Sequence, residues 1–347
     1  MKKKIFAVAA VLMAVAAVSA YAPATGSESL FELSSPNGMT YASSVTGGGV
    51  PYVNSASISV NPALTAKSQR VGLNAGYTAL ITKGDKTKLG SMFQAGLMVP
   101  FKWAVVSGEL YGAMPNSPSM TIGNSMILET GLSKEITEHL DVGLGVNTGV
   151  RWGGFADWGL SANLGFVYEM GNLGFMKDFR YGVSISNLGK NYGSTEEKEF
   201  ISSYPGFCTI RAGASGLFFA NDNIKIGGSL DLSTPCFCNM VMDTGVQLTL
   251  KDMLTISVAE KINLKEAING NKNYIPSIGM LFTFKFNTNN EYLASHDWSE
   301  SEMTVGAAYK NIYENVNAAS MGCDLRLGLK DETPPVIQIW FDEEEDE

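Results

Sequence analysis

Apolar and polar side chains alternate along most of this chain, from about residue 70 to residue 330. Between residues 141 and 152, for example, Leu144, Val146 and Val150 lie on one face of an extended strand, opposite mostly Gly and polar residues. An amphipathic helix would instead place its apolar residues three and four positions apart. The alternation with a period of two therefore predicts β-strands along this whole region.

The alternating segments have a length that suits a membrane-spanning barrel. About fourteen segments follow one another, each of the ~10 residues expected of a transmembrane strand. They begin near residues 70, 90, 102, 123, 140, 157, 179, 206, 223, 238, 253, 274, 301 and 318. Ten residues that rise about 3.3 Å each and tilt by about 45° cover about 23 Å, close to the ~25 Å apolar band of such barrels. We therefore predict an all-β fold, a transmembrane antiparallel β-barrel of about fourteen strands.

A soluble β-sandwich also alternates, with its apolar face inward, so alternation alone does not separate the two classes. The polar faces here are rich in Gly, Ser, Asn and Thr and carry scattered charges, unlike the surface of a soluble sheet. Charged residues make up 17% of the chain, below the ~25% usual for soluble domains. These observations favour the barrel over the alternative, a soluble exported β protein.

The N-terminus has the pattern of a secretory signal peptide. Lys2 to Lys4 form a positive region, an apolar stretch follows from Ile5 to Val18, and Ala20-Tyr21-Ala22 matches a cleavage site. The apolar stretch is shorter than the ~20 residues that a spanning helix needs. We therefore divide the chain into a signal peptide (1–22), an N-terminal hatch segment (23–69), the barrel (70–330) and an acidic C-terminal tail (331–347).

The connections between the strands predict an orientation. If the first strand starts in the periplasm, the periplasmic connections are mostly short and the opposite ones mostly long, as in outer-membrane barrels. The exception is the long connection near residues 287–300. An even strand number places both termini in the periplasm. We therefore expect a protein of the bacterial outer membrane, with the lipid bilayer and the outer-membrane insertion machinery as its partners.

A barrel of this size needs something inside it. Eight-stranded barrels fill with their own side chains and barrels of 16–18 strands leave a water channel, so about fourteen strands lie between the two. The Gly- and Ser-rich hatch segment is the candidate occupant, because irregular backbone is tolerated inside protein but not against lipid. Asn61 can cap a helical turn and Pro62 is pre-set for its first position. We predict that Asn61, Pro62 and Ala63 form the hinge between hatch and barrel wall.

Charged residues on the polar strand faces are the candidate lumen-lining groups. They are Glu109, Arg151, Arg211, Lys225, Asp231, Asp243, Lys285, Asp324 and Arg326. Two interpretations of them stay open: structural pairing inside the lumen, including contacts that hold the plug, and substrate binding.

The sequence offers little enzymatic chemistry. His139 and His296 lie in predicted turns or loops without metal-ligand spacing, and we find no nucleophile elbow, P-loop or dinucleotide fingerprint. We therefore predict no enzymatic activity, no cofactor and no metal site. The net charge of −9, without clustered Lys and Arg, argues against nucleic acid as a partner.

The four cysteines are too few for a disulfide scaffold. Cys208 falls at the outer start of a predicted strand, and Cys236 and Cys238 fall in the next outer loop. Because an exported protein meets oxidising conditions, Cys208 with Cys236 or Cys238 is a candidate disulfide. Cys323 falls on the lipid face, where packing is its expected role.

Several of these features together match a known family. They are the signal peptide, the Ser/Gly-rich N-terminus, Asn61-Pro62-Ala63 directly before the first strand and Asp331 to Pro335 just after the last. Over roughly residues 40 to 335 the chain resembles the FadL-type outer-membrane channels, and within them the PorV/PorQ-like proteins, including a spirochaete family of FadL-like barrels. The last strand departs from many such barrels because it does not end in an aromatic residue; Trp340 and Phe341 are candidates for that role.

The resemblance implies a function. It implies a channel for hydrophobic small molecules such as long-chain fatty acids, gated by an N-terminal plug. The alternative is a non-transporting barrel of the PorV type that acts as a secretion-associated shuttle or a surface scaffold.

Overall fold

The computed structural model describes residues 30–40, 44–82, 89–115, 124–153, 156–190, 208–237, 239–268, 275–287, 291–295, 300–313 and 316–328. The predicted signal peptide, the first residues of the hatch segment, Cys238, His296 and the acidic tail lie outside these ranges. What the sequence predicts for them stays a prediction.

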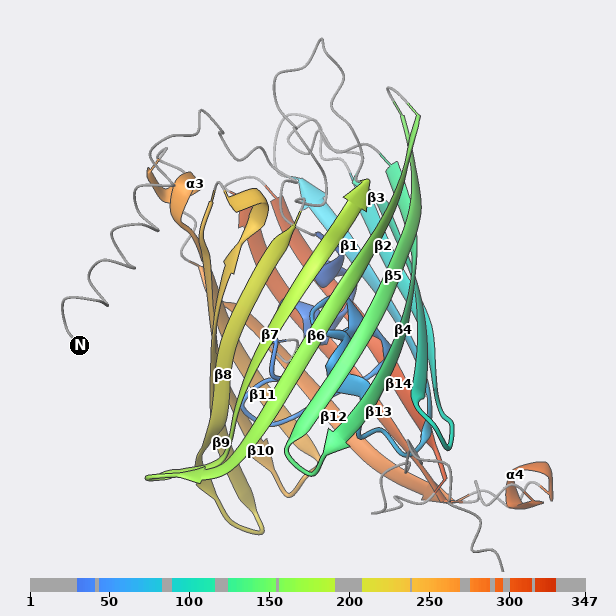
Figure 1. Ribbon diagram of the computed structural model, residues 1–347, viewed down its shortest axis with the longest axis vertical. Coiled ribbons are helices and arrows are strands. Elements are labelled where there is room, and N and C mark those ends of the chain that lie inside the picture. The colour runs from blue at the N-terminus through green and yellow to red at the C-terminus, as the bar shows by residue number, and fades with distance from the viewer. Residues whose placement is uncertain are drawn as a thin grey trace, which may run out of the picture.

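The described part of the chain contains fourteen strands that close into one antiparallel barrel (Figure 1). They are β1 (Val71–Thr82), β2 (Leu89–Pro100), β3 (Val105–Met114), β4 (Asn124–Thr137), β5 (Leu140–Trp152), β6 (Asp157–Leu173), β7 (Met176–Lys190), β8 (Thr209–Ala220), β9 (Ile224–Thr234), β10 (Val241–Leu250), β11 (Leu254–Asn263), β12 (Ser277–Asn287), β13 (Glu300–Tyr313) and β14 (Val316–Leu327). Each strand pairs with its neighbours in sequence, and β1 pairs with β14 from Val71↔Leu327 to Thr82↔Val316. Every predicted strand start lies within three residues of the observed one, so the fold prediction is confirmed.

The outer surface of the barrel carries the large apolar side chains. Leu144, Val146 and Val150 are 46%, 43% and 51% exposed, and Trp158 and Ile278 are each 54% exposed. A surface of this kind is stable against lipid rather than water, and the closed ladder leaves no unpaired strand edge. The alternation therefore has its apolar face outward, as the barrel prediction requires.

The two ends of the barrel differ. Tight turns at residues 138–139, 221–223 and 251–253 join β4 to β5, β8 to β9 and β10 to β11; we call this the short-turn end. At the opposite, long-loop end, residues 191–208 separate β7 from β8 and residues 264–276 separate β11 from β12. Helix α3 (Leu264–Ile268) lies at the long-loop end and α4 (Glu291–Ser295) at the short-turn end (Figure 1). Which end faces the periplasm stays a prediction.

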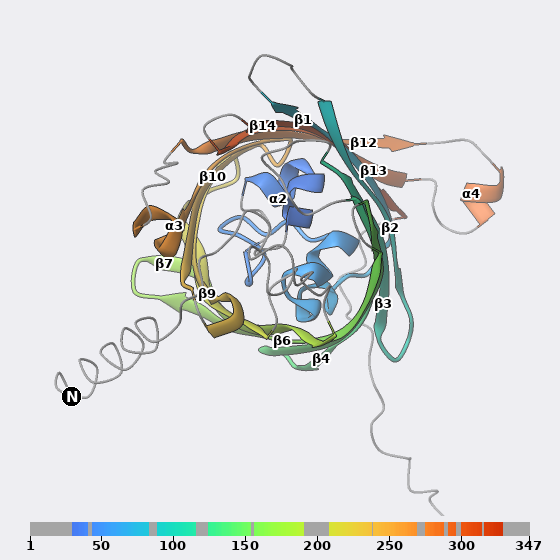
Figure 2. The ribbon, with the colours of Figure 1, turned by 90° about the horizontal axis from the view of Figure 1, so that it is seen from above.

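The N-terminal segment lies inside the barrel (Figure 2). We call its described residues, 30–40 and 44–70, the plug. The plug contains η1 (Leu30–Ser34), α2 (Pro36–Met39), η2 (Ser55–Ser59) and η3 (Pro62–Thr65), joined by irregular backbone. Its side chains pack against the inner wall: Phe31, Leu33 and Met39 share a buried apolar cluster with residues of β1 to β4, β13 and β14. Among the described residues, no helix is long and apolar enough to cross a membrane.

Candidate functional site: the plugged lumen

The turn formed by Asn61, Pro62 and Ala63 connects the plug to the wall of the barrel. The Asn61 side chain accepts a hydrogen bond from the Ala63 N–H at 3.0 Å and so caps η3, whose first residue is Pro62. Its amide Nδ2 donates to the Val45 carbonyl at 2.7 Å and to the Phe166 carbonyl of β6 at 3.2 Å. The predicted cap-and-proline start of a helical turn is confirmed.

Two glycines of the wall make room for this turn. A Cβ atom on Gly143 of β5 would lie 2.3 Å from the Pro62 carbonyl carbon, and one on Gly165 of β6 would lie 1.9 Å from Asn61 Oδ1. Asn61, Pro62 and Ala63 are all buried. The turn therefore lies within the lumen and against the wall. Its role as a hinge stays a prediction.

At the short-turn end, Lys67 ties the end of the plug to three strands. Its Nζ lies 2.8 Å from Glu169 of β6 and 3.8 Å from both Glu135 of β4 and Asp141 of β5. It also donates to the Glu138 carbonyl at 3.2 Å. Burial by itself lowers the pKa of Lys67, but the hydrogen bond to Glu169 and the surrounding carboxylates raise it overall. Lys67 therefore stays protonated, and the neighbouring carboxylates balance its positive charge.

A second set of contacts joins the plug to β14, next to the line where the barrel closes on β1. Asp324 accepts hydrogen bonds from the Tyr52 hydroxyl and from Asn54 Nδ2, the latter at 2.9 Å. Arg326 donates to the Val53 carbonyl at 2.8 Å, and its guanidinium lies over the Tyr52 ring, 5.0 Å from the centroid. Burial and then the charge of Asp324 raise the pKa of Tyr52, so its hydroxyl remains a donor.

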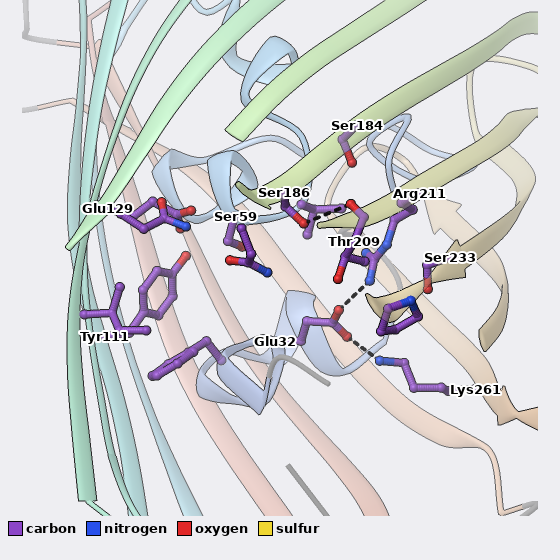
Figure 3. A pocket seen from close by; sticks show the side chains of 16 residues that line it. Glu32, Ser59, Tyr111, Glu129, Ser184, Ser186, Thr209, Arg211, Ser233 and Lys261 are labelled. Carbon is purple, nitrogen blue, oxygen red and sulfur yellow. Dashed lines mark hydrogen bonds and ion pairs between the residues drawn. The ribbon is translucent and has the colours of Figure 1, made fainter. Parts of the chain in front are cut away.

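In the long-loop half of the lumen, Glu32 of η1 bridges two strands (Figure 3). Its Oε1 lies 2.7 Å from Arg211 Nη2 of β8, and its Oε2 lies 2.9 Å from Lys261 Nζ of β11. Asp243 of β10 lies 3.9 Å from the same Arg211 nitrogen. Burial by itself would raise the pKa of Glu32, but Lys261 and Arg211 hold it well below its usual range. We call Glu32, Arg211 and Lys261 the charge clamp.

Two further predicted lumen residues hold the plug. Glu109 of β3 accepts a hydrogen bond from Ser55 Oγ at 2.7 Å, and Asp231 of β9 accepts from Ser44 Oγ at 2.8 Å and from the Val45 N–H at 2.7 Å. Glu109 and Asp231 are 1% and 0% exposed, so the plug supplies hydrogen bonds that water does not.

The remaining three predicted residues have other surroundings. Arg151 is buried on β5, directly across the ladder from Ser125 of β4. Lys225 forms an ion pair with Asp252 at 2.7 Å at the short-turn end, and Lys285 is exposed near the same end. The structure thus brings Arg211, Asp243, Asp324, Arg326, Glu109 and Asp231 together around the plug, and leaves Lys225 and Lys285 at the rim.

Three charged residues that join plug and wall are absent from the predicted lumen set: Lys261, Glu32 and Lys67. Lys261 lies on the inward-facing side of β11, and its alternation with Ala259 and Ser257 was a signal that would have added it to the lumen set. Glu32 and Lys67 lie in the plug, where no periodicity indicates which wall residue each one meets. Their positions depend on the path of the plug through the barrel.

Two cavities lie on opposite sides of the plug. One, of about 60 Å³, lies in the long-loop half between η1 and strands β3, β4, β5, β7, β8, β9 and β11, and the charge clamp forms part of its lining. The other, of about 310 Å³, lies at the short-turn end. Both cavities mix apolar and charged walls: Phe31, Tyr111 and Ile127 line the first, and Val53, Leu64 and Met98 line the second. The plug therefore lies between a cavity in the long-loop half of the lumen and a cavity at the short-turn end.

The disulfide of Cys208 with Cys236 or Cys238 stays a prediction. Cys208 is a free thiol next to the start of β8, and burial together with the neighbouring Cys236 thiol raises its pKa. Cys238 lies outside the described residues. Within the described ranges, no group of three or more His, Cys, Asp and Glu residues is arranged to hold a metal ion.

Fold and lumen together define a transmembrane β-barrel closed by an internal plug. No family model and no curated protein matches the sequence. Among solved structures, a deletion mutant of the TodX monoaromatic hydrocarbon channel is similar with a TM-score of 0.50 at 8% identity, over 87% of this chain and 100% of that one. The Pseudomonas putida toluene transporter TodX has a TM-score of 0.48 at 10% identity, over 82% and 96% of the two chains. A Pseudomonas aeruginosa FadL homologue has a TM-score of 0.46 at 10% identity, over 83% and 96%.

Proposed function

We propose that this protein is an outer-membrane channel for small molecules with an apolar body, such as long-chain fatty acids, and that the plug closes it in the present conformation. The observation that carries the proposal is the pair of cavities, one in the long-loop half of the lumen and one at the short-turn end, with the plug between them. A barrel whose lumen was filled for structural reasons alone has no need of a cavity on each side of the plug.

The lining of the cavities supports this class of cargo. Each places apolar side chains next to buried or half-buried charges, which suits a molecule with an apolar body and one polar end. The similarity in fold to a monoaromatic hydrocarbon channel supports the same class. Export by a signal peptide, periplasmic termini, assembly by the outer-membrane insertion machinery and a closer relation to PorV/PorQ-like barrels remain parts of the proposal.

Opening would require the plug to leave part of the wall. The contacts that resist this are the charge clamp, the hydrogen bonds of Asn61, and the Asp324 and Arg326 contacts. Because these contacts are spread over separate strands, one part of the plug can move while the others stay bound. We propose that cargo enters on the long-loop side and leaves on the short-turn side.

Uptake of a labelled long-chain fatty acid by cells tests the proposal. A host that lacks its own channel of this kind should take up the label when it expresses this protein, and uptake should be saturable. The matched control is a variant with Lys225→Gln, which keeps the barrel and changes a charge that lies away from the plug. Uptake at the level of the empty host, with the barrel present and heat-modifiable in the outer membrane, would favour the non-transporting shuttle or scaffold.

A further inference from the structure

The cavity at the short-turn end has a charged side and an apolar side. Its charged lining comes from Arg70, which directly precedes β1, from Glu302 of β13 and Arg326 of β14, and from Lys67. Its apolar lining comes from Pro51, Val53, Leu64 and Met98. Its volume of about 310 Å³ is at the lower end of the ~300–1,000 Å³ range of small-molecule sites.

The two arginines share one carboxylate. Arg70 Nη1 lies 3.7 Å from Glu302 Oε2, and Arg326 Nη1 lies 3.6 Å from Glu302 Oε1. Both distances are longer than the ~2.7–3.2 Å of a direct hydrogen bond. Within the described part of the chain, Arg70 Nε is buried without a hydrogen-bond partner. The pair of guanidinium groups therefore has one more positive charge than Glu302 balances, and donors that Glu302 does not use.

In the described part of the chain, the charge of Asp324 on β14 also acts on Arg326, but the oxygens of this carboxylate already accept hydrogen bonds. Their donors are Tyr52 and Asn54 of the plug. The acidic residues of β4, β5 and β6 at this end surround Lys67 instead. A buried or half-buried guanidinium favours a planar anion that can accept two hydrogen bonds, such as a carboxylate.

We propose that this cavity binds an amphiphile with a single carboxylate, with its head group between Arg70 and Arg326 and its short apolar portion against Val53, Leu64 and Met98. The inference rests on the proposed channel function, in which this cavity is the last site before cargo leaves. Glu302 competes with the ligand for the same two guanidinium groups. Its charge therefore weakens binding and aids release, so removing that charge should tighten binding.

The test uses the full-length barrel in lipid nanodiscs, with binding of octanoate measured by calorimetry. Octanoate should bind, whereas acetate, which lacks the chain, and 1-octanol, which lacks the charge, should each bind about tenfold more weakly or worse. Arg70→Gln should weaken octanoate binding about tenfold, because it removes one charge-assisted contact. Lys225→Gln, which lies at the same end on β9 and outside the cavity, should leave it unchanged.

The decisive variant is Glu302→Gln. The proposal requires octanoate to bind this variant several-fold more tightly, whereas a Glu302 that only holds the wall together would give weaker or unchanged binding. Weaker or unchanged octanoate binding in Glu302→Gln, or equal binding of octanoate and octanol by the wild type, overturns the proposal. Heat-modifiable migration of each variant shows that the barrel has formed.

The two proposals fail in different ways. If cells take up the fatty acid normally but these charge changes do not alter octanoate binding, the carboxylate site is ruled out and the channel function stands. If the variants change octanoate binding in the expected directions but cells show no uptake, the channel function is ruled out and the carboxylate site stands.

Discussion

At the scale of single residues, the plug depends on glycines of the wall, which let it come close, as much as on wall side chains that bind it. Gly143 and Gly165 allow the Asn61–Pro62 turn to lie directly on the backbone of β5 and β6. The same closeness lets Asn61 reach the Phe166 carbonyl. A wall of larger side chains would push the turn toward the barrel axis and leave the Asn61 amide without that acceptor, a loss that costs about 1–3 kcal/mol for a buried polar group.

Replacing one of these glycines should therefore loosen the plug without opening the barrel wall. In Gly143→Ala the new methyl group meets the backbone of Pro62 and Ala63, which has to shift, at a cost of about 1–3 kcal/mol. We expect higher ion conductance in planar bilayers, with heat-modifiable migration retained. Gly108→Ala is the control, because a Cβ atom there meets nothing within 4 Å. Equal conductance of the two variants would contradict a plug held by this contact.

At the scale of elements, the strands and the plug differ in how far the sequence determines them. Each strand has one face toward lipid and one toward the lumen, so a period of two marks it, and the predicted starts lie within three residues of those observed. The plug meets the wall through contacts between residues far apart in sequence; Glu32 and Arg211 are 179 positions apart. No local pattern encodes such a pairing. The predicted set of lumen charges therefore contained Arg211 and its wall neighbour Asp243, but not Glu32, its partner in the plug.

The charge clamp between η1 and strands β8 and β11 gives a prediction for pH. The pKa of Glu32 is held below its ordinary value, so the stabilisation by this contact is complete above the ordinary pKa of about 4.3 and is lost only as pH falls through the lower folded-state value. Between pH 8 and pH 5 we expect no contribution of Glu32 to any change in conductance. Glu32→Gln should raise conductance at both pH values, because breaking a buried ion pair costs about 3–5 kcal/mol.

Bilayer recordings at pH 8 and pH 5 check this, with Glu291→Gln on α4, outside the barrel wall, as the control. Wild-type conductance in the Glu32 variant would show that other contacts hold η1. A rise that occurs in the wild type between pH 8 and pH 5 and disappears in the variant would contradict the direction of the Glu32 pKa.

At the scale of the whole molecule, the barrel and the plug depend on different forces. The barrel is closed by its own hydrogen-bond ladder, including the β1–β14 pairing from Val71↔Leu327 to Thr82↔Val316, and by lipid around its apolar outer face. The plug is held by hydrogen bonds and ion pairs to buried polar groups of the inner wall, among them Glu109, Asp231 and Asp324. Removing the plug should therefore expose those groups to water, where they are solvated, and leave the ladder intact.

Deletion of residues 30–69 tests this separation. We expect a barrel that still shows heat-modifiable migration and conducts ions through a permanently open lumen, since about fourteen strands enclose more space than their own side chains fill. Its thermal stability should be lower than that of the full chain, because the plug no longer bridges β1, β3, β8, β9, β11 and β14. A deletion variant that forms no barrel would show that the plug is part of the folding core, and gating by its movement would then have to be confined to a part of it, such as η1 and the charge clamp.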